Sequence, residues 1–227
     1  MQEQVKSKQR VAEYGEVLTP QWIVNAMLDL VRQETERIDS RFLEPACGTG
    51  NFLAEVLRRK LDQVEKIYRR SQLDFERNLV LAVSSIYGID ILEDNVIECR
   101  ERLFAIANER YTARFKARAK EACRQTLRCI LGRNIVWGNA LSLKTAPDEA
   151  APIIFSEWTL VNGSSIKRRD FSFESLISQS SLRELPLFSD AGEEVFIPKP
   201  VADYPPVHFL RIGSANGSAN GSANGRE

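Results

Sequence analysis

The stretch "FLEPACGTGNFLAEVL", residues 42–57, constrains the fold more than any other part of the sequence. A short apolar run leads through Glu44 into a turn of small residues that holds Gly48 and Gly50, and an apolar-periodic segment begins at Phe52. A strand, a glycine turn and a helix in this order bring backbone close to a ligand and point the helix's first amides at it. The spacing is not Gly-x-Gly-x-x-Gly, and no Lys-Ser/Thr follows as in a phosphate loop. The stretch therefore predicts a ligand-binding α/β domain without naming the ligand.

Strand and helix patterns alternate beyond this stretch, which is typical of a doubly wound, mostly parallel sheet. Thr19 as N-cap and Pro20 as first helical residue predict a helix start before the first strand. Strands are predicted over residues 41–44, 85–91, 134–137 and 152–155, and helices over 51–61, 93–107 and 113–131. A charged helical insertion is predicted to continue from the first of these helices to residue 83. The alternation stops after Trp158, so we expect an incomplete second half. The predicted units are an α/β domain (1–158), an irregular Pro-rich extension (159–212) and a flexible tail of Gly-Ser-Ala-Asn repeats (213–227).

Composition excludes several classes of protein. Lysine plus arginine equals aspartate plus glutamate at 31 each, so any basic surface must be local. The four cysteines have no paired spacing, and we interpret them as reduced thiols of a cytoplasmic protein. His208 is the only histidine, which argues against a His-dependent triad or a multi-histidine metal site. The single histidine and the unpaired cysteine spacing lead us to expect no metal. No apolar run is long enough to span a bilayer, so we expect no membrane partner either.

Four blocks in order resemble the adenine-N6 DNA methyltransferases, which bind S-adenosylmethionine (SAM). "FLEPACGTGNFL" resembles their motif I, and "GEVLTPQWIVNAML" upstream of it is similar to motif X. "YGIDI" resembles motif II, and "VWGNAL" resembles motif III. Motif X before motif I is the order of the gamma class, and the resemblance covers residues 15–142. It implies a SAM site formed by Thr19, Pro20, Glu44, Pro45, Ala46, Cys47, Gly48, Gly50, Phe52, Asp90, Ile91, Asn139 and Ala140.

Two of these residues have distinct implied roles. By the resemblance, Asp90 accepts hydrogen bonds from the ribose hydroxyls, and Asn139 stands where the family has an Asp that accepts from the cofactor's adenine amine. An amide oxygen accepts more weakly than a carboxylate because it is uncharged. Taken alone, a residue such as Asp90 is more often a capping or loop carboxylate, and one such as Asn139 is more often a turn residue. A glycine turn taken alone is more often a plain strand-to-helix connection.

The reaction centre of the family is missing from the expected place. The family carries Asn/Asp-Pro-Pro-Tyr/Phe there, whose acceptors bind the target amine while the aromatic ring stacks on the flipped-out base. This chain has Ser156, Glu157 and Trp158 instead. Glu157 could accept a hydrogen bond and Trp158 could stack, but a strand end with a core tryptophan explains them better. The later "DYPPV" has the right residue types in the wrong order and reads as a Pro-rich turn.

Basic residues at helical spacing offer a DNA-binding surface. On one helix, rows four residues apart would form a broad basic face that could meet phosphates. A solvated helix face explains the same pattern. The candidate residues are Arg110, Arg114, Arg118, Lys120 and Arg124, with Lys116 and Arg128 beside them, and a second cluster of Lys167, Arg168 and Arg169.

The resemblance implies a SAM-dependent DNA adenine-N6 methyltransferase or modification subunit of a restriction-modification or defence system. Its partners would be DNA and a specificity or restriction subunit that supplies target recognition. The alternative is a catalytically inactive SAM-binding partner that regulates a DNA-modification complex, and a protein or RNA substrate is a third hypothesis.

Overall fold

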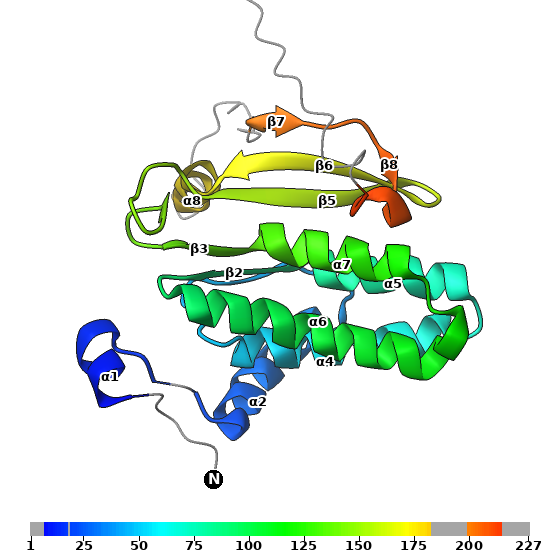
Figure 1. Ribbon diagram of the computed structural model, residues 1–227, viewed down its shortest axis with the longest axis horizontal. Helices are drawn as coiled ribbons and strands as arrows, with labels where there is room; N and C mark the ends of the chain where they lie inside the picture. The colour runs from blue at the N-terminus through cyan, green and yellow to red at the C-terminus, as the bar shows by residue number, and fades with distance from the viewer. Residues whose placement is uncertain (1–6, 18, 183–198, 215–227) are drawn as a thin grey trace, which may run out of the picture.

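The computed structural model describes residues 7–17, 19–182 and 199–214, and two four-stranded sheets lie among them (Figure 1). In the first sheet the order is β1-β2-β3-β4, with β1, β2 and β3 parallel and β4 antiparallel to β3. Its strands are β1 (Phe42–Glu44), β2 (Ile86–Asp90), β3 (Ile135–Asn139) and β4 (Lys144–Thr145). The three parallel strands fall where the sequence predicts them, so the predicted α/β class with a mostly parallel sheet is confirmed.

Two long parallel helices cover one face of this sheet, and both begin at the carboxyl ends of the strands (Figure 1). They are α4 (Asn51–Tyr68) and α6 (Glu93–Phe115). Two further helices, α5 (Gln72–Ser84) and α7 (Glu121–Asn134), lead into the amino ends of β2 and β3. The segment 51–83 is therefore two helices rather than a charged insertion on the fold, since Phe75, Leu79 and Val80 of α5 are fully buried.

The second face of the parallel sheet is covered by a second sheet, formed by the part of the chain that follows β4 (Figure 1). All its strand pairs are antiparallel, and Phe155 of β5 clusters with Tyr87 and Ile89 of β2. It contains β5 (Ile154–Asn162), β6 (Ser165–Ser172), β7 (Ala202–Asp203) and β8 (Val207–His208), followed by the 3-10 turn η2 (Phe209–Arg211). Helix α8 (Phe173–Leu182) follows β6. The strand expected at 152–155 thus belongs to a hairpin and not to the parallel sheet.

The predicted boundary after residue 158 falls inside β5, and the extension from 159 is ordered where it is described. Buried polar pairs hide the strand pattern in "SIKRRDFS", because Arg168 and Asp170 are both buried and paired with each other. The repeat tail from residue 215, residues 183–198 of the extension and the first six residues lie outside the described part of the chain.

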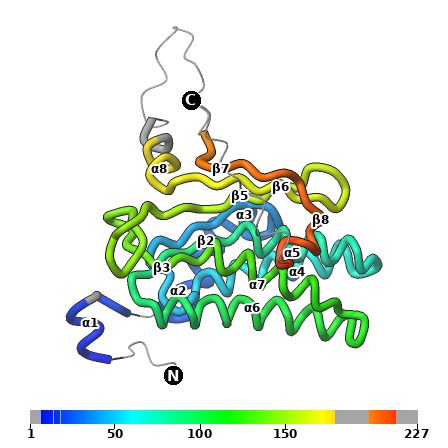
Figure 2. Tube along the Cα trace, turned by 45° about the horizontal axis from the view of Figure 1, so that its top comes forward, coloured from blue at the N-terminus to red at the C-terminus, as the bar shows by residue number. Residues whose placement is uncertain are grey.

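The N-terminal helices are α1 (Lys8–Tyr14), α2 (Gln21–Leu30) and α3 (Arg32–Glu36). Figure 2 shows α1 away from the sheets, beside the end of the molecule where β3 finishes. Helix α2 begins at Gln21 with Pro20 as N-cap and no side-chain cap, so the predicted Thr19 cap is wrong by one residue. Its apolar residues face outward more than the spacing suggests, since only Val24 and Leu28 are buried and Trp22 is 72% exposed.

Candidate functional site

The turn between β1 and α4 has the geometry that the glycines predict. Gly48 has φ 51° and Gly50 has φ 84°, both in the left-handed region that favours glycine. Gly50 is the N-cap of α4 and supplies no side-chain cap, so the first amides of this 18-residue helix are not capped by a side chain. Cys47 N donates to the Ile89 carbonyl at 2.9 Å, which ties the turn to the end of β2. The turn therefore presents uncapped backbone donors at the carboxyl edge of the sheet, where open α/β sheets bind ligands.

Asp90, at the end of β2, is part of the same edge and is 8% exposed. Its Oδ2 accepts from Gly48 N at 2.8 Å. Its Oδ1 accepts from Leu92 N at 2.9 Å and from Asn95 Nδ2 at 3.2 Å. The structure thus brings together two elements of the predicted site, and Asp90 also holds the glycine turn in place.

Thr49 stands out within the turn, and the sequence reasoning missed it. Its side chain is 2% exposed, and Oγ1 is buried with no hydrogen-bond partner in the described structure. A buried hydroxyl without a partner costs about 1–3 kcal/mol, so an unpaired one is uncommon in a folded protein. Glu44 is half-buried beside the turn, and desolvation raises the pKa of its carboxyl against the opposing hydrogen bond from the Ala46 amide. A polar ligand bound at this edge could hydrogen-bond to both the Thr49 hydroxyl and the Glu44 carboxyl.

Two thiols pack under the turn. A hydrogen bond with Cys99, together with burial, raises the pKa of the Cys47 thiol well above its usual range, so this thiol stays protonated. Any Cβ at Gly50 would lie 2.6 Å from Cys99 Sγ. The second glycine is therefore required both by its backbone conformation and by the packing of Cys99 beneath it. Cys47 itself is 6% exposed and lies in the main core cluster with Leu53 and Cys99. Phe52 is partly buried and packs against the same cluster. Pro45 and Ala46 form part of the turn.

The end of β3 shows the turn chemistry that was the alternative interpretation of Asn139. Asn139 Oδ1 accepts from Leu141 N at 2.9 Å, and its Nδ2 donates to Glu149 Oε1 at 3.0 Å. Hydrogen bonds from Ser142 and then Asn139 lower the pKa of Glu149. Asn139 therefore serves the loop after β3, and an adenine amine would have to displace one of these bonds. Ala140 packs partly buried against the cluster between the sheets.

The remaining predicted cofactor residues lie at the rim of this edge. Ile91 follows Asp90 directly, is 44% exposed, and its carbonyl accepts from Trp137 Nε1 at 3.0 Å. Thr19 contributes its carbonyl, which accepts from Asn51 Nδ2 at 3.2 Å at the start of α4. Pro20 and Thr19 are thereby joined to the glycine turn through Asn51, although neither caps a helix with its side chain.

The surroundings of Glu157 and Trp158 favour the strand-end interpretation over the catalytic one. Consecutive strand residues point to opposite faces, so the two side chains diverge. Glu157 lies between Arg41 and Arg169, at 2.5 Å from each guanidinium. Trp158 is 6% exposed and donates from Nε1 to Asn134 Oδ1 at 3.0 Å.

The two residues also lie away from the glycine turn. Arg41 immediately precedes β1, so Glu157 lies at the amino end of that strand, opposite the glycine turn. A mostly apolar pocket of about 230 Å³ adjoins it, lined by Arg41, Leu43, Tyr87, Phe155, Ser156, Glu157, Phe171 and Leu176. Ser156 donates from Oγ to Asp170 Oδ1 at 2.7 Å.

The basic residues of the predicted DNA surface do not share one helix face. The chain turns between α6 and α7 through the 3-10 segment η1 (Lys116–Arg118), so the two rows lie on different elements. Most of their charges already have partners within the chain. Arg110 pairs with Asp62 and Glu65, Lys120 with the fully buried Glu76, Arg124 with Glu121, Lys167 with Asp203, Arg168 with Asp170, and Arg169 with Glu157.

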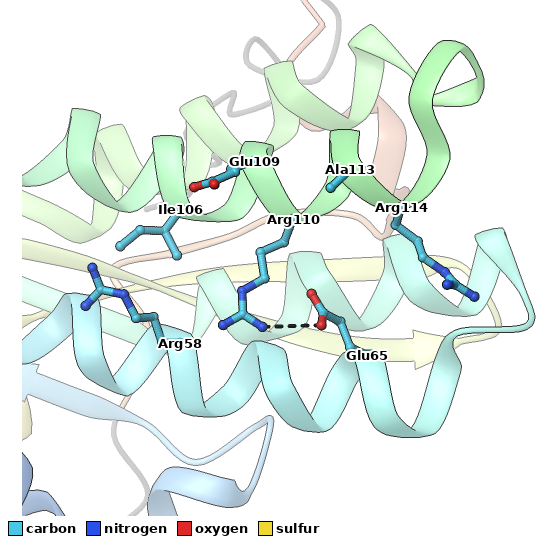
Figure 3. Close-up of a pocket in the computed structure, with 7 residues that line it drawn as sticks. All are labelled: Arg58, Glu65, Ile106, Glu109, Arg110, Ala113 and Arg114. Carbon is cyan, nitrogen blue, oxygen red and sulfur yellow. Dashed lines mark ion pairs between the residues drawn. The ribbon is translucent and has the colours of Figure 1, made fainter.

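Figure 3 shows where two of these arginines lie. Arg110 and Arg114 of α6 face Arg58 and Glu65 of α4 across an open groove of about 610 Å³. Arg114 donates to the Arg69 carbonyl, at the carboxyl end of α4. The groove therefore lies near the far ends of both helices from the glycine turn.

A parallel sheet with a glycine turn after β1, a carboxylate at the end of β2 and a polar loop after β3 defines a methyltransferase-type α/β domain. Residues 21–148, more than half of the chain, match the family model of the MmeI DNA-methyltransferase domain. The chain belongs to this family and is a DNA methyltransferase of restriction-modification type, which favours the enzyme over the inactive partner. No curated protein and no solved structure matches the chain.

The matched residues include β1–β4 and the whole edge from Glu44 to Asn139, but end before Glu157 and Trp158. In the described part of the chain, no helix could cross a membrane and no group of His, Cys, Asp or Glu side chains could hold a metal ion.

Proposed function

We propose that the methyl donor of this DNA methyltransferase is SAM and that it binds at the carboxyl edge of β1 and β2. The observation that carries the proposal is the pairing of Asp90 with the glycine turn, next to the unpartnered Thr49 Oγ1. A ribose diol needs a carboxylate acceptor, and an amino acid zwitterion needs backbone donors and a carboxyl such as Glu44. These groups occur together at this edge, and the chemistry of the donor set fits SAM.

Asp90 would hold the ribose, the turn from Pro45 to Gly50 would follow the methionine part, and the rim formed by Thr19, Pro20 and Phe52 would close the site beside it. Ile91 and Ala140 would flank the adenine. Asn139 would accept from the adenine amine only after giving up a loop hydrogen bond, so we expect adenine recognition to be weaker than ribose recognition.

The target we propose is the exocyclic N6 of adenine, as the resemblance of the sequence motifs implies. Methyl transfer forms an N–C bond as the S–C bond breaks, and a proton leaves the amine. The lone pair of the adenine amine is delocalised into the ring, which makes the amine a poor nucleophile. The reaction therefore needs acceptors for the amine hydrogens, which stabilise the positive charge that develops on the nitrogen. Removing one such preorganised group typically costs about 2.7–4 kcal/mol of transition-state stabilisation. Glu157 is neutralised by two arginines and Trp158 is buried, so neither is available to the target amine. We therefore expect the described residues alone to transfer methyl groups slowly, although they bind SAM.

The test measures binding and transfer separately. SAM is titrated into the chain by calorimetry, and tritiated methyl transfer is measured on mixed genomic DNA, with Glu157→Gln as the matched variant outside the proposed site. We expect saturable SAM binding, slow transfer and no effect of Glu157→Gln on binding. Absence of SAM binding would refute the donor site. Fast transfer that collapses in Glu157→Gln would show that Glu157 acts on the substrate despite its arginine partners.

A further inference from the structure

The N-terminal helix α1 is connected to Asp90 by a continuous run of hydrogen bonds. Arg10 Nη2 donates to Asn95 Oδ1 at 3.2 Å, and Arg10 Nε donates to Glu16 Oε2 at 2.5 Å. Asn95 Nδ2 donates to Glu16 Oε1 at 2.7 Å and to Asp90 Oδ1 at 3.2 Å. We call Arg10, Glu16 and Asn95 the N-terminal relay. It joins a segment far away in the sequence to the carboxylate of the proposed donor site.

The relay fixes the orientation of the Asn95 side chain, which is 1% exposed. Its amide oxygen faces a guanidinium donor, and its two amide hydrogens face two carboxylates, Glu16 and Asp90. The reversed amide would place an oxygen against both carboxylates and an NH₂ group against Arg10. An amide has one acceptor end and one donor end, so only the observed orientation satisfies all three neighbours.

This orientation matters because Asp90 has little spare capacity. A carboxylate offers about four lone-pair directions, and three donors of the protein already occupy Asp90: the amides of Gly48 and Leu92 and the side chain of Asn95. About one direction is left for a ligand hydroxyl. Asn95 occupies one lone-pair direction of Asp90 and thereby helps to set which direction stays open to the ligand. Arg10 and Glu16 in turn hold the Asn95 side chain in this orientation.

We propose that Arg10, Glu16 and Asn95 are positioning residues for ribose recognition, and that docking of residues 8–16 and donor binding favour each other. This inference rests on the proposed donor site. Coupling between two binding events is reciprocal: the factor by which docking tightens donor binding equals the factor by which the donor tightens docking. The relay thus makes the N-terminal segment part of the donor site without a contact to the donor.

The experiment measures both directions of this coupling with SAM as the probe. Calorimetry gives the SAM Kd of the full chain, of Glu16→Gln and of Asn95→Asp. Amide hydrogen exchange of residues 8–16 is followed with and without saturating SAM. Glu13→Gln is the matched control, because Glu13 lies on the same helix and accepts a hydrogen bond from Gln9 at its exposed surface.

We expect Glu16→Gln to weaken SAM binding about three- to tenfold, the equivalent of one hydrogen bond, and to abolish the protection that SAM confers on residues 8–16. Asn95→Asp, which places a third carboxylate between two others, should weaken binding more. Glu13→Gln should match the parent in both measurements. A merely structural role would lower the Tm of Glu16→Gln and leave its Kd unchanged.

Three outcomes would overturn the proposal. The relay is refuted if Glu16→Gln has the same SAM Kd as the parent, or if SAM does not change the amide hydrogen exchange of residues 8–16. Neither result contradicts the donor site itself. No SAM binding by the parent refutes the donor site and the relay with it. If Asn95→Asp does not fold, Glu16→Gln still decides the question because it keeps the size of the side chain and replaces only one of its two acceptor oxygens with a donor.

Discussion

The two ends of the parallel sheet are both rich in buried polar groups, yet they use them differently. At the amino end, Asn134 donates to the Ser84 and Ile86 carbonyls and accepts from Trp158, so both ends of its amide have partners within the protein. Glu157 is held between two arginines at the same end. At the carboxyl end, Thr49 Oγ1 has no partner in the described structure, and Asp90 keeps about one free direction.

The difference teaches that a carboxylate marks a ligand site by its unused capacity and not by its charge. Glu157 and Asp90 are both carboxylates next to strands of the same domain. Glu157 is neutralised by two guanidinium groups of the chain, whereas Asp90 accepts from amide groups that leave about one direction open. We therefore expect substitutions at the amino end to change stability alone, and substitutions at the carboxyl end to change ligand binding as well.

Trp158→Ala should give the largest change, and the change should be in stability alone. Removing a buried aromatic side chain typically costs about 3–5 kcal/mol, and the substitution also leaves Asn134 Oδ1 without its donor. Chemical denaturation measures the loss, and calorimetry on the folded variant measures SAM binding. Trp22→Ala is the control, since Trp22 is 72% exposed and should change stability by about 0.5 kcal/mol or less. A weaker SAM Kd in Trp158→Ala would break the proposed division between the two ends.

Asp90→Ala should affect both stability and binding. It removes the acceptor of the Gly48 and Leu92 amides, and a buried donor left unpaired costs about 1–3 kcal/mol. Loss of a hydrogen bond to a charged group costs about 1.5–3 kcal/mol, so SAM binding should weaken about tenfold or more. The matched variant is Asp39→Ala, an exposed carboxylate that pairs with Arg37 near the amino end. Equal SAM affinities of Asp90→Ala and the parent would show that Asp90 only holds the turn.

The sequence predicted the backbone of the carboxyl end, its strands and its glycine turn, because their signals are local. Glycines with positive φ, a strand-end carboxylate and their spacing all lie within short segments, and the three parallel strands followed from the apolar pattern. The second sheet was not predictable in this way. Its buried face contains Arg168 and Asp170, whose mutual ion pair removes the apolar alternation that identifies a strand.

The same limit explains the errors in the site. Nothing near Glu157 in the sequence shows that Arg41, over a hundred residues earlier, will neutralise it. The turn at η1 was hidden because basic residues continue through it at helical spacing. Thr49 could have been suspected from its place between two glycines, but its missing partner is a property of the packed structure.

Lys60 gives the amino end a pH dependence of its own. Its amine is fully buried and donates to the Arg37, Ile38 and Ser40 carbonyls and to Ser85 Oγ, before the starts of β1 and β2. Burial lowers the pKa of Lys60 from 10.5 to about 7. Between these pH values the unfolded chain holds a proton that the folded chain has released, so the contribution of Lys60 to stability rises with pH. It is fully present above about pH 10.5 and is lost as the pH falls through 7.

The slope from one such group is at most about 1.4 kcal/mol per pH unit. Denaturation of the parent and of Lys60→Met from about pH 7 to about pH 10 should give a difference that grows with pH, because other titrating groups, such as the buried thiols, are common to both proteins. A constant difference across this range would mean that Lys60 stays protonated in the fold, held as an ammonium by its four acceptors.

The smallest expected effect concerns DNA and the basic residues at the far ends of the helices. Arg114 lies near the end of α6, a helix of 23 residues, which is about 34 Å long at 1.5 Å per residue. Arg114 and Arg118 are therefore far from the edge where a target base would meet the donor.

Removing one side chain that binds a phosphate would reduce the slope of log K against log salt by about 0.9. We expect Arg114→Gln with Arg118→Gln to leave both the affinity for DNA and this slope unchanged, measured by fluorescence anisotropy at several salt concentrations. Lys120 stays unmodified because it pairs with the buried Glu76, and its loss would uncover a buried carboxylate and confound the result. A slope smaller by about one or two units would show that DNA extends along α6 to the groove of Figure 3, and the sheet's carboxyl edge would then be only part of the binding surface.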